Sequence, residues 1–476
     1  MDKKGNRTEN LRENSSMKNT DNSRTVNTRE LITDTLLEID KGKQHCHILI
    51  RNVLDKYQYL DENDRAFIKT VIQGTLEQRI RMDYCLDQIS NTPVHKMKPW
   101  IRALMRMSAY QIMCMDKIPD RAVCNEAVKL AQKRKFQNLK GWVNAVLRNL
   151  ARQKEEIAYP SRQKEPIQFL SIQYSMPEFL TKQLVEEYGM ETAEGILQGM
   201  LKKRELYVRI QRNYLEEKSF ADICMEWKQQ GIEYKQSSLL KDAYSLKNTK
   251  NLGQLADFIN GKYTVQNISS MLVCTVADIK KDMLVLDVCA APGGKAIHAA
   301  DLMSGTGHVL ARDLTQYKVE LIRENIERLK TDNITAEVFD ATTKDLEMLE
   351  KADVVLADVP CSGIGVIGRK PDIKYNLSED SLRSLEILQK QIIDSIWQYV
   401  KPEGVLIYST CTIRREENED MVSYIKNHYP FETESVETYL PIQLSPACGE
   451  DGNLKILPDG KMDGFFIARL RRKEAI

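Results

Sequence analysis

Apolar residues recur at helical spacing through most of residues 28–160. The runs at 67–76 and 143–150, for example, place their apolar side chains on one face of a helix. Prolines such as Pro93 and Pro119 lie between such runs, where helices begin or end. Short connections between amphipathic helices are typical of an all-α bundle. We therefore predict a helical domain over residues 28–160.

The pattern changes twice further along the chain. Residues 161–262 combine a helical run at 178–188 with an alternating, β-rich run at 206–210, which predicts a small α+β linker subdomain. In residues 263–476, apolar runs of strand length alternate with longer helical stretches. This alternation predicts an α/β domain with a parallel sheet covered on both faces. The last apolar run, 464–470, is expected to be an edge strand joined by a hairpin.

Composition narrows the class of protein but does not identify a function. The net charge is +1, and none of the ten cysteines belongs to a Cys-x-x-Cys pair, which removes the main support for a zinc ribbon. No metal is expected. Residues 1–27 are polar and predict a disordered tail without the apolar core of a signal peptide. No apolar run is long enough to cross a bilayer, so we expect a cytoplasmic protein. Nothing indicates an obligate dimer, and a monomer is expected.

The segment 284–295 predicts a strand, a glycine turn and the start of a helix. Glycines at such a bend let the backbone approach a ligand closely. A phosphate-binding P-loop would need Gly at Cys289 and Ser or Thr at Ala296, and the dinucleotide pattern G-x-G-x-x-G is also absent. The ligand is therefore expected to carry no phosphate.

Three acidic residues follow successive predicted strands: Asp313, Asp340 and Asp358. Any one of them could be a loop or helix cap. Because ligands of open α/β sheets bind at the carboxyl ends of the strands, the set favours a binding site for a nucleoside. A carboxylate such as Asp313 suits ribose, since it accepts hydrogen bonds from both hydroxyls.

Two cysteines lie at the same predicted edge of the sheet, Cys361 after the fourth strand and Cys411 after the fifth. Either one alone could be an inert packing residue. Together they suit methylation of a pyrimidine, whose carbon 5 is a poor nucleophile. A thiolate that adds to carbon 6 makes carbon 5 electron-rich, and a second polar group can assist release of the product.

Several motifs, taken in order, carry a resemblance to a known family. They are Asp287-Val-Cys-Ala-Ala-Pro-Gly-Gly-Lys295, Asp358-Val-Pro-Cys-Ser-Gly363, and Ser409-Thr-Cys411 followed by Glu416-Glu-Asn418. Together they resemble the Nol1/Nop2/Sun family of RNA 5-methylcytosine methyltransferases. Asn125-Glu-Ala-Val128 and the segment 142–149 resemble the NusB-like RNA-binding domain that is fused to one branch of that family.

The resemblance implies a Rossmann-like domain that uses S-adenosylmethionine to methylate carbon 5 of one cytosine in 16S ribosomal RNA, unassembled or early in assembly. It makes Cys411 the nucleophile, Cys361 the group that assists release, and Asp358 a neighbour of both cofactor and cytosine. Asp313 would hold the ribose and Asp340 would lie near the adenine. The methionine part of the cofactor would be lined by Cys289, Ala290, Ala291, Pro292, Gly293, Gly294 and Lys295. A basic pair, Arg369 and Lys370, would lie near the RNA.

Other functions stay open at this point. The substrate could be another RNA, or the chain could be a non-catalytic RNA-binding or assembly factor built on the helical domain. A DNA cytosine methyltransferase would use the thiol in the place of Cys361, but there Gln follows the cysteine where this chain has Ser362, and no large recognition insert is visible. An amino-group methyltransferase would need an aromatic side chain near Pro360 rather than a thiol.

Overall fold

The computed structural model describes residues 26–42, 44–249 and 252–474. The predicted tail, 1–27, lies almost entirely outside the described residues. At the start of the described chain, the Asn27 side chain caps helix α1 (Thr28–Asp40) by accepting a hydrogen bond from the backbone N–H of Glu30. No helix in these described ranges is both long and apolar enough to cross a membrane.

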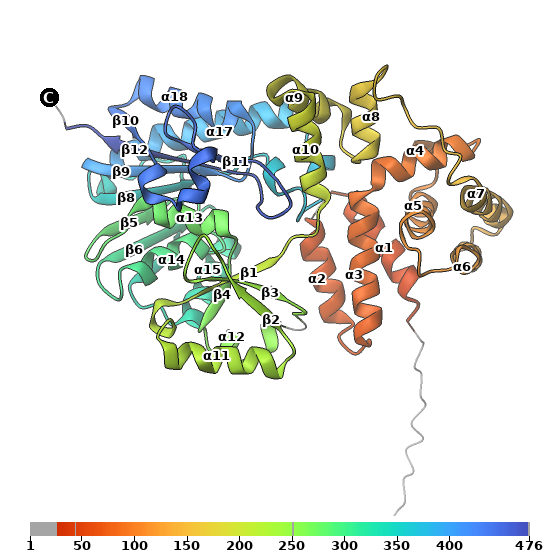
Figure 1. Ribbon diagram of the computed structural model, residues 1–476, viewed down its shortest axis with the longest axis horizontal. Coiled ribbons are helices and arrows are strands. Elements are labelled where there is room, and N and C mark those ends of the chain that lie inside the picture. Colours follow the sequence, from red (N-terminus) through yellow and green to blue (C-terminus); the bar gives the residue numbers. More distant parts are fainter. Residues whose placement is uncertain (1–25, 43, 250–251, 475–476) are drawn as a thin grey trace, which may run out of the picture.

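The predicted helical bundle is confirmed, and its core is continuous from Ile32 to Ile157. Helix α5 runs through its middle and is buried on nearly all sides (Figure 1). Most of its residues are apolar, and a helix that is buried on nearly all sides belongs in the centre of a bundle. The helices after α1 are α2 (Cys46–Lys56), α3 (Glu62–Glu77), α4 (Arg79–Ile89), α5 (Pro99–Cys114), α6 (Asp120–Lys133) and α7 (Lys140–Gln153).

The region between the two larger domains contains three helices followed by a small antiparallel sheet. The sheet has the order β2-β3-β1-β4, and Trp227 of α11 is fully buried against it beside Tyr263. The elements are α8 (Pro166–Gln173), α9 (Glu178–Tyr188), α10 (Met190–Leu201), β1 (Leu206–Ile210), α11 (Glu217–Gln229), β2 (Glu233–Gln236), β3 (Ala243–Lys247), α12 (Ala256–Ile259) and β4 (Tyr263–Val265).

The C-terminal region is the predicted α/β domain. Its main sheet has the order β10-β12-β9-β8-β5-β6-β7, and the strands from β9 to β7 are parallel. One apolar cluster lies under α13 and α14, and a second lies under α17 and α18, so helices cover both faces. The strands are β5 (Leu284–Asp287), β6 (His308–Asp313), β7 (Ile334–Val338), β8 (Ala352–Asp358), β9 (Val400–Thr410), β10 (Phe431–Glu434), β11 (Leu454–Ile456) and β12 (Phe465–Arg472). The helices are α13 (Ile268–Ala277), α14 (Gly294–Leu302), α15 (Gln316–Leu329), α16 (Ile373–Asn376), α17 (Glu379–Ile396) and α18 (Glu419–His428).

The prediction of an edge strand at 464–470 is wrong in one respect. The strand that covers these residues, β12, is antiparallel and pairs with β11 as a hairpin would, but it lies inside the sheet between β9 and β10. Strand β10 provides the edge instead. It is only four residues long, and its apolar and polar residues alternate weakly, so its sequence does not predict a strand.

The order of the strands determines where a ligand can bind. From β5 the chain proceeds outward to β6 and β7, and then returns to the other side of β5 as β8 and β9. The carboxyl ends of β5 and β8 therefore form a topological switch point, the usual ligand site of such sheets.

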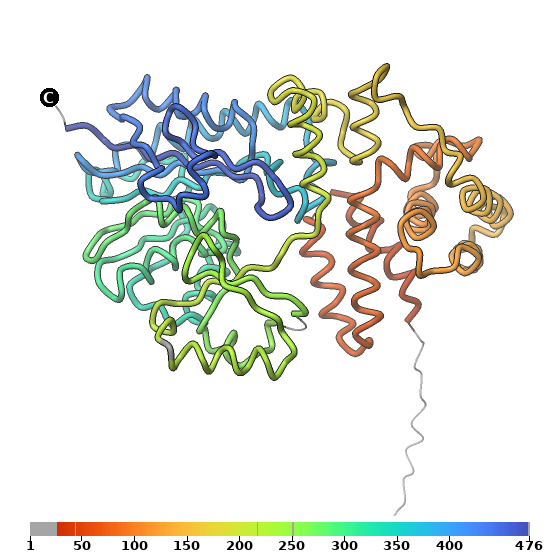
Figure 2. The backbone as a smooth tube through the Cα atoms, viewed as in Figure 1, coloured from red at the N-terminus to blue at the C-terminus, as the bar shows by residue number. Residues whose placement is uncertain are grey.

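The helical domain is docked against the segment that follows β8 (Figure 2). Lys374 is buried there, and its Nζ donates to the carbonyl oxygens of Glu77 at 2.8 Å and Ser175 at 2.5 Å. Tyr375 donates to the carbonyl of Leu76 at 2.6 Å. These contacts place the bundle close to the edge of the sheet at which the candidate site lies.

Candidate active site

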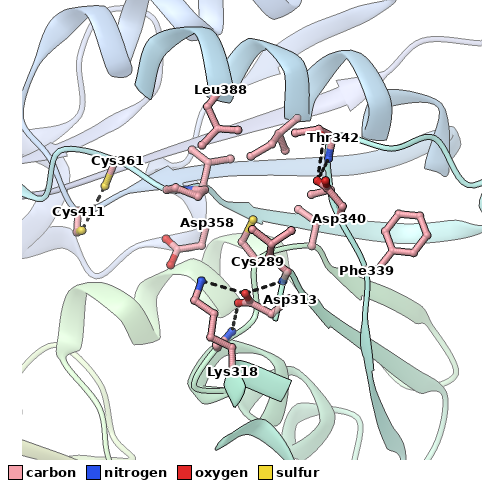
Figure 3. A pocket seen from close by; sticks show the side chains of 17 residues that line it. Cys289, Asp313, Lys318, Phe339, Asp340, Thr342, Asp358, Cys361, Leu388 and Cys411 are labelled. Atoms are coloured by element: carbon pink, nitrogen blue, oxygen red, sulfur yellow. Dashed lines mark hydrogen bonds and ion pairs between the residues drawn. The ribbon is translucent and has the colours of Figure 1, made fainter. Parts of the chain in front are cut away.

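A cavity of about 280 Å³ opens at the switch point. It is lined by residues from the ends of β5, β6, β7, β8 and β9, and it brings together six residues that the sequence predicts to share one site (Figure 3). In this view the two thiols lie at one end and Asp340 at the other, with Asp358 and Asp313 between them. The six are Cys289, Asp313, Asp340, Asp358, Cys361 and Cys411.

The glycine turn after β5 forms one wall of the site. Gly293 has φ +100°, and a Cβ there would lie 3.2 Å from a methyl carbon of Ile322, so only glycine fits without strain. Helix α14 begins at Gly294. A smaller hollow of about 190 Å³ lies beside the cavity and is lined by Ala290, Ala291, Pro292, Gly294, Lys295 and Asp358, among others.

Asp313 is buried and rigidly held at the end of β6. Its carboxylate accepts hydrogen bonds from the backbone N–H groups of Ala291 at 3.0 Å and Leu314 at 2.8 Å, and it forms an ion pair with Lys318 at 3.0 Å. The carboxylate thereby joins the glycine turn to α15. With two oxygens, it retains acceptor capacity toward the cavity.

Asp340 is exposed and lies two residues beyond β7. Its carboxylate accepts hydrogen bonds from the hydroxyl of Thr342 at 2.7 Å and from the backbone N–H of the same residue at 2.9 Å. These bonds lower the pKa of Asp340. The preceding Phe339 packs under the Arg312 guanidinium, 4.1 Å from the ring centre, and Arg312 pairs with acidic side chains outside the cavity.

Asp358 is held between two side chains at the end of β8. Its Oδ2 lies 2.5 Å from Nζ of Lys295, and its Oδ1 accepts a hydrogen bond from the hydroxyl of Ser409 at 2.8 Å. Lys295 comes from the start of α14 and Ser409 from β9, so the carboxylate joins three elements. A carboxylate paired with a lysine can only accept further hydrogen bonds.

The two thiols contact each other. Sγ of Cys361 and Sγ of Cys411 are 3.3 Å apart. The pKa of Cys411 is lowered, first by the hydrogen bond from Cys361 and also by the positive charges of Lys370 and Lys295. The pKa of Cys361 is raised by the same hydrogen bond and by burial. Of the two thiols, Cys411 is therefore the one that ionises more readily.

The two cations predicted to lie near the RNA, Arg369 and Lys370, differ in their contacts. Arg369 forms an ion pair with the buried Asp463 at 2.5 Å and donates to the carbonyl of Glu205 at 3.3 Å. Arg204 binds the same carboxylate at 3.0 Å. Lys370 is exposed. Of the two cations, only Lys370 is free of such a network in the described contacts, and its charge acts on Cys411.

Three residues around this site were not predicted from the sequence to have a functional role. Lys318 pairs with Asp313, Ser409 orients Asp358, and Glu417 accepts a hydrogen bond from the backbone of the Cys361 loop at 2.8 Å. A signal existed for two of them, since Ser409 and Glu417 belong to the motifs quoted above. Lys318 lies on an ordinary amphipathic helix and gave no signal.

Comparisons with known proteins agree with this arrangement. Residues 274–471 match the family model "16S rRNA methyltransferase RsmB/F", and residues 26–152 match that of the NusB family. Among solved structures, one described as PH0851 superposes with a TM-score of 0.78 at 22% identity, covering 94% of this chain and 99% of that one. NSun6 from Pyrococcus horikoshii with SFG gives a TM-score of 0.56 at 21% identity, covering 63% and 99% of the two chains. At these identities the likeness shows the fold.

Curated relatives extend the match to nearly the whole chain. A protein of Serratia proteamaculans named ribosomal RNA small subunit methyltransferase B is 30% identical, over 89% of this chain and 96% of its own length. A protein of Bacillus subtilis named probable ribosomal RNA small subunit methyltransferase B is 37% identical, over 94% of this chain and 98% of its own length. The chain therefore belongs to the family of S-adenosylmethionine-dependent ribosomal RNA small subunit methyltransferases B, with its NusB domain at the amino end.

Proposed function

We propose that this protein methylates carbon 5 of a specific cytosine in 16S ribosomal RNA, and that Cys411 attacks the base during the reaction. The observation that carries the proposal is the contact between two thiols, 3.3 Å apart, which line the cavity at the switch point of the sheet. Transfer of a methyl group to a nitrogen or oxygen needs no thiol. Transfer to carbon 5 of a pyrimidine needs a covalent nucleophile at carbon 6.

The residues present fit S-adenosylmethionine, a ligand without phosphate. Asp313 supplies acceptor oxygens suited to ribose hydroxyls, and the glycine turn leaves room for close approach of a ligand to the backbone. In this proposal Asp340 lies near the adenine, and the turn from Cys289 to Lys295 lines the methionine part. When bound, the cofactor supplies the methyl group as a positively charged sulfonium.

The chain's own residues do the rest of the chemistry. Cys411 adds to carbon 6 as a thiolate, which the S–H of Cys361 has stabilised by a hydrogen bond. Asp358 accepts a hydrogen bond from the exocyclic amino group of the cytosine. The ammonium group of Lys295, 2.5 Å from Asp358, faces the negative charge that develops on the ring.

Release reverses the addition. Once carbon 5 carries the methyl group, it loses its proton to water, the double bond between carbons 5 and 6 reforms, and Sγ of Cys411 leaves as a thiolate. The S–H group of Cys361 again donates to that sulfur, which makes it a better leaving group. A target base must reach Cys411 unpaired, so the cytosine lies in a loop or flips out of its helix.

The test is to incubate the purified protein and its Cys411→Ala variant with unmethylated 16S RNA and cofactor, and to digest the RNA to nucleosides. We expect 5-methylcytidine with the wild type and none with the variant, while cofactor binding is retained. Normal activity of Cys411→Ala would refute the covalent mechanism. Methylation of another RNA, but not of 16S RNA, would refute the proposed substrate.

A further inference from the structure

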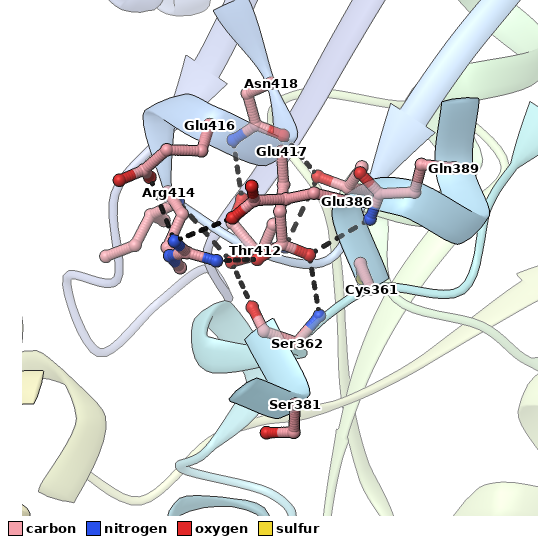
Figure 4. A network of polar contacts seen from close by, with 12 residues as sticks. Cys361, Ser362, Ser381, Glu386, Gln389, Thr412, Arg414, Glu416, Glu417 and Asn418 are labelled. Atoms are coloured by element: carbon pink, nitrogen blue, oxygen red, sulfur yellow. Dashed lines mark hydrogen bonds and ion pairs between the residues drawn. The ribbon is translucent and has the colours of Figure 1, made fainter. Parts of the chain in front are cut away.

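A buried carboxylate, Glu417, lies between Arg414 and the loop that carries Cys361 (Figure 4). Glu417 ends the turn Arg415–Glu417, a few residues after Cys411, and its side chain is 0% exposed. Ionised side chains are costly to bury and persist where they are fully bonded. The mechanism above does not use Glu417, and the contacts of its carboxylate suggest a role.

The carboxylate fixes the loop that carries Cys361. Oε2 of Glu417 accepts the backbone N–H of Ser362 at 2.8 Å and the side-chain amide of Gln389 at 3.1 Å. The same Gln389 amide donates to the carbonyl of Pro360 at 2.9 Å. The peptide groups on both sides of Cys361 are therefore bonded to one acid–amide pair.

The same residue is tied to the strand that carries Cys411. The hydroxyl of Tyr408, on β9, donates to the backbone carbonyl of Glu417 at 2.6 Å. Directly after the two cysteines, the hydroxyls of Ser362 and Thr412 are hydrogen-bonded at 2.8 Å. Glu417 thus bridges the end of β9 to the loop after β8, in which the other thiol lies.

The charge of the carboxylate is balanced by Arg414, which lies on the other side of Glu417 from Cys361 in Figure 4. Nη1 of Arg414 lies 3.3 Å from Oε1 of Glu417, while Nη2 of the same guanidinium contacts Glu386 at 3.1 Å and Glu416 at 3.3 Å. Glu416 is half exposed and, in the described contacts, bonds to neither cysteine loop. It therefore offers a matched control for Glu417.

We propose that Glu417 is a positioning residue that holds the Cys361 loop against the Cys411 loop, and so maintains the hydrogen bond between the two sulfur atoms. The inference rests on the proposed function for its catalytic meaning, but the state of the two thiols can be measured without RNA. A hydrogen bond between a thiol and a thiolate weakens steeply with distance, so a small shift of the Ser362 peptide would loosen it.

The charges around the thiols agree with this role. The pKa of Cys361 is raised by its hydrogen bond to Cys411, by burial and by the charges of Cys411, Glu417 and Asp358. Around Cys411, Asp358 acts in the opposite sense to Lys370 and Lys295. Loss of the Glu417 charge and of its bond to Ser362 would ease ionisation of Cys361 and weaken the hydrogen bond that stabilises Cys411. The two thiols would then become more alike.

The experiment measures initial rates of iodoacetamide alkylation of Cys411 and of Cys361 in the full-length protein, from pH 5 to 10, with peptides resolved by mass spectrometry. In the wild type we expect two well-separated midpoints, with Cys411 the lower. In Glu417→Gln, which has nearly the same volume, we expect the separation to shrink by about one pH unit or more. In Glu416→Gln we expect a change of less than about 0.3 pH units, because that residue does not touch the cysteine loops.

Circular dichroism and thermal melting establish that each variant is folded. If Glu417→Gln does not fold, Gln389→Met decides, since it removes the second contact to the Cys361 loop and leaves the carboxylate. It should narrow the separation in the same direction. If Glu417→Gln folds and the separation between the two midpoints is unchanged, the inference is overturned. If Glu417→Gln does not fold, an unchanged separation in Gln389→Met overturns it. Failure of the wild type to make 5-methylcytidine would overturn the proposed function instead, and would leave the alkylation result standing.

Discussion

Sγ of Cys361 and Sγ of Cys411 lie in contact, 3.3 Å apart, although 50 residues separate them along the chain. The contact arises because β8 and β9 are neighbouring parallel strands and Asp358 is in register with Ser409. Cys361 follows the end of β8 by three residues, and Cys411 follows the end of β9 by one. The pair shares one hydrogen bond, which lowers the pKa of Cys411 and raises that of Cys361.

Removal of Cys361 should separate addition from release. In Cys361→Ala, Cys411 can still attack carbon 6, but its sulfur loses the donor that makes it a good leaving group. We expect a covalent protein–RNA complex to accumulate with 16S RNA and cofactor, visible as a slow, nuclease-sensitive band on a denaturing gel. Turnover should fall by about 10²-fold or more.

The double variant Cys361→Ala/Cys411→Ala is the control for that band. It should give no covalent complex, because the nucleophile is absent. A band that persists in the double variant would assign the attack to another residue. Rapid turnover by Cys361→Ala without any band would show that release does not depend on the second thiol.

The sequence predicted which side chains meet at the cavity but not how they bond to one another. Asp313, Asp358, Cys361 and Cys411 could be placed together because the carboxyl ends of parallel strands share one edge. Each of them follows a predicted strand, so all of them are expected at this one edge even when the order of the strands in the sheet is unknown. The proton shared by the two thiols depends on register and loop conformation, which no spacing rule specifies.

Other contacts were beyond sequence reasoning for the same reason. The prediction that Arg369 lies near the RNA stays a prediction, and nothing in the sequence indicated that its guanidinium binds Asp463, 94 residues away. Glu417 accepts its hydrogen bond from Ser362 across 55 residues. Such pairs are set by how β12 and the loops pack, and β12 itself was predicted at the edge because the short strand β10 left no clear pattern.

Asp358 should matter for the chemical step more than for the cofactor. Asp358→Asn keeps the shape of the side chain but removes the charge that pairs with Lys295 and replaces an acceptor by a donor. We expect single-turnover methyl transfer to fall by roughly 10²- to 10³-fold, with cofactor affinity changed only a few-fold. Ser409→Ala, which removes only the orienting hydroxyl, should fall less. An equal loss in both variants would make orientation, rather than charge, the main contribution of Asp358.

Asp313, in contrast to Asp358, should affect binding of the cofactor more than the chemical step. Asp313→Ala removes the acceptor for the ribose and also releases the Ala291 N–H and Lys318. We expect the affinity for S-adenosylhomocysteine, measured by calorimetry, to fall by about 10- to 100-fold, which corresponds to loss of one or two hydrogen bonds to a charged group. Glu320→Gln, on the same α15 and exposed, should bind normally. Normal binding by Asp313→Ala would exclude it from the ribose site.

Lys374 should make the docking of the helical domain dependent on pH. Burial lowers the pKa of Lys374 from 10.5 to about 7 in the folded protein. Between pH 7 and 10 the unfolded state therefore binds more protons at this site, and the contribution of Lys374 to the free energy of unfolding rises with pH. Below pH 7 both states are protonated, and the contribution is lowest.

A comparison with Lys374→Met isolates this effect from all other titrations. The difference in unfolding free energy, wild type minus variant, should increase from pH 7 to 9 by up to about 1.4 kcal/mol per pH unit. Denaturant melts of both proteins at several pH values measure it, and Lys390→Met, on the exposed side of α17, should show no such slope. A difference that does not vary with pH would mean that Lys374 stays charged where it contacts Glu77 and Ser175, and that its two carbonyl partners compensate for its burial.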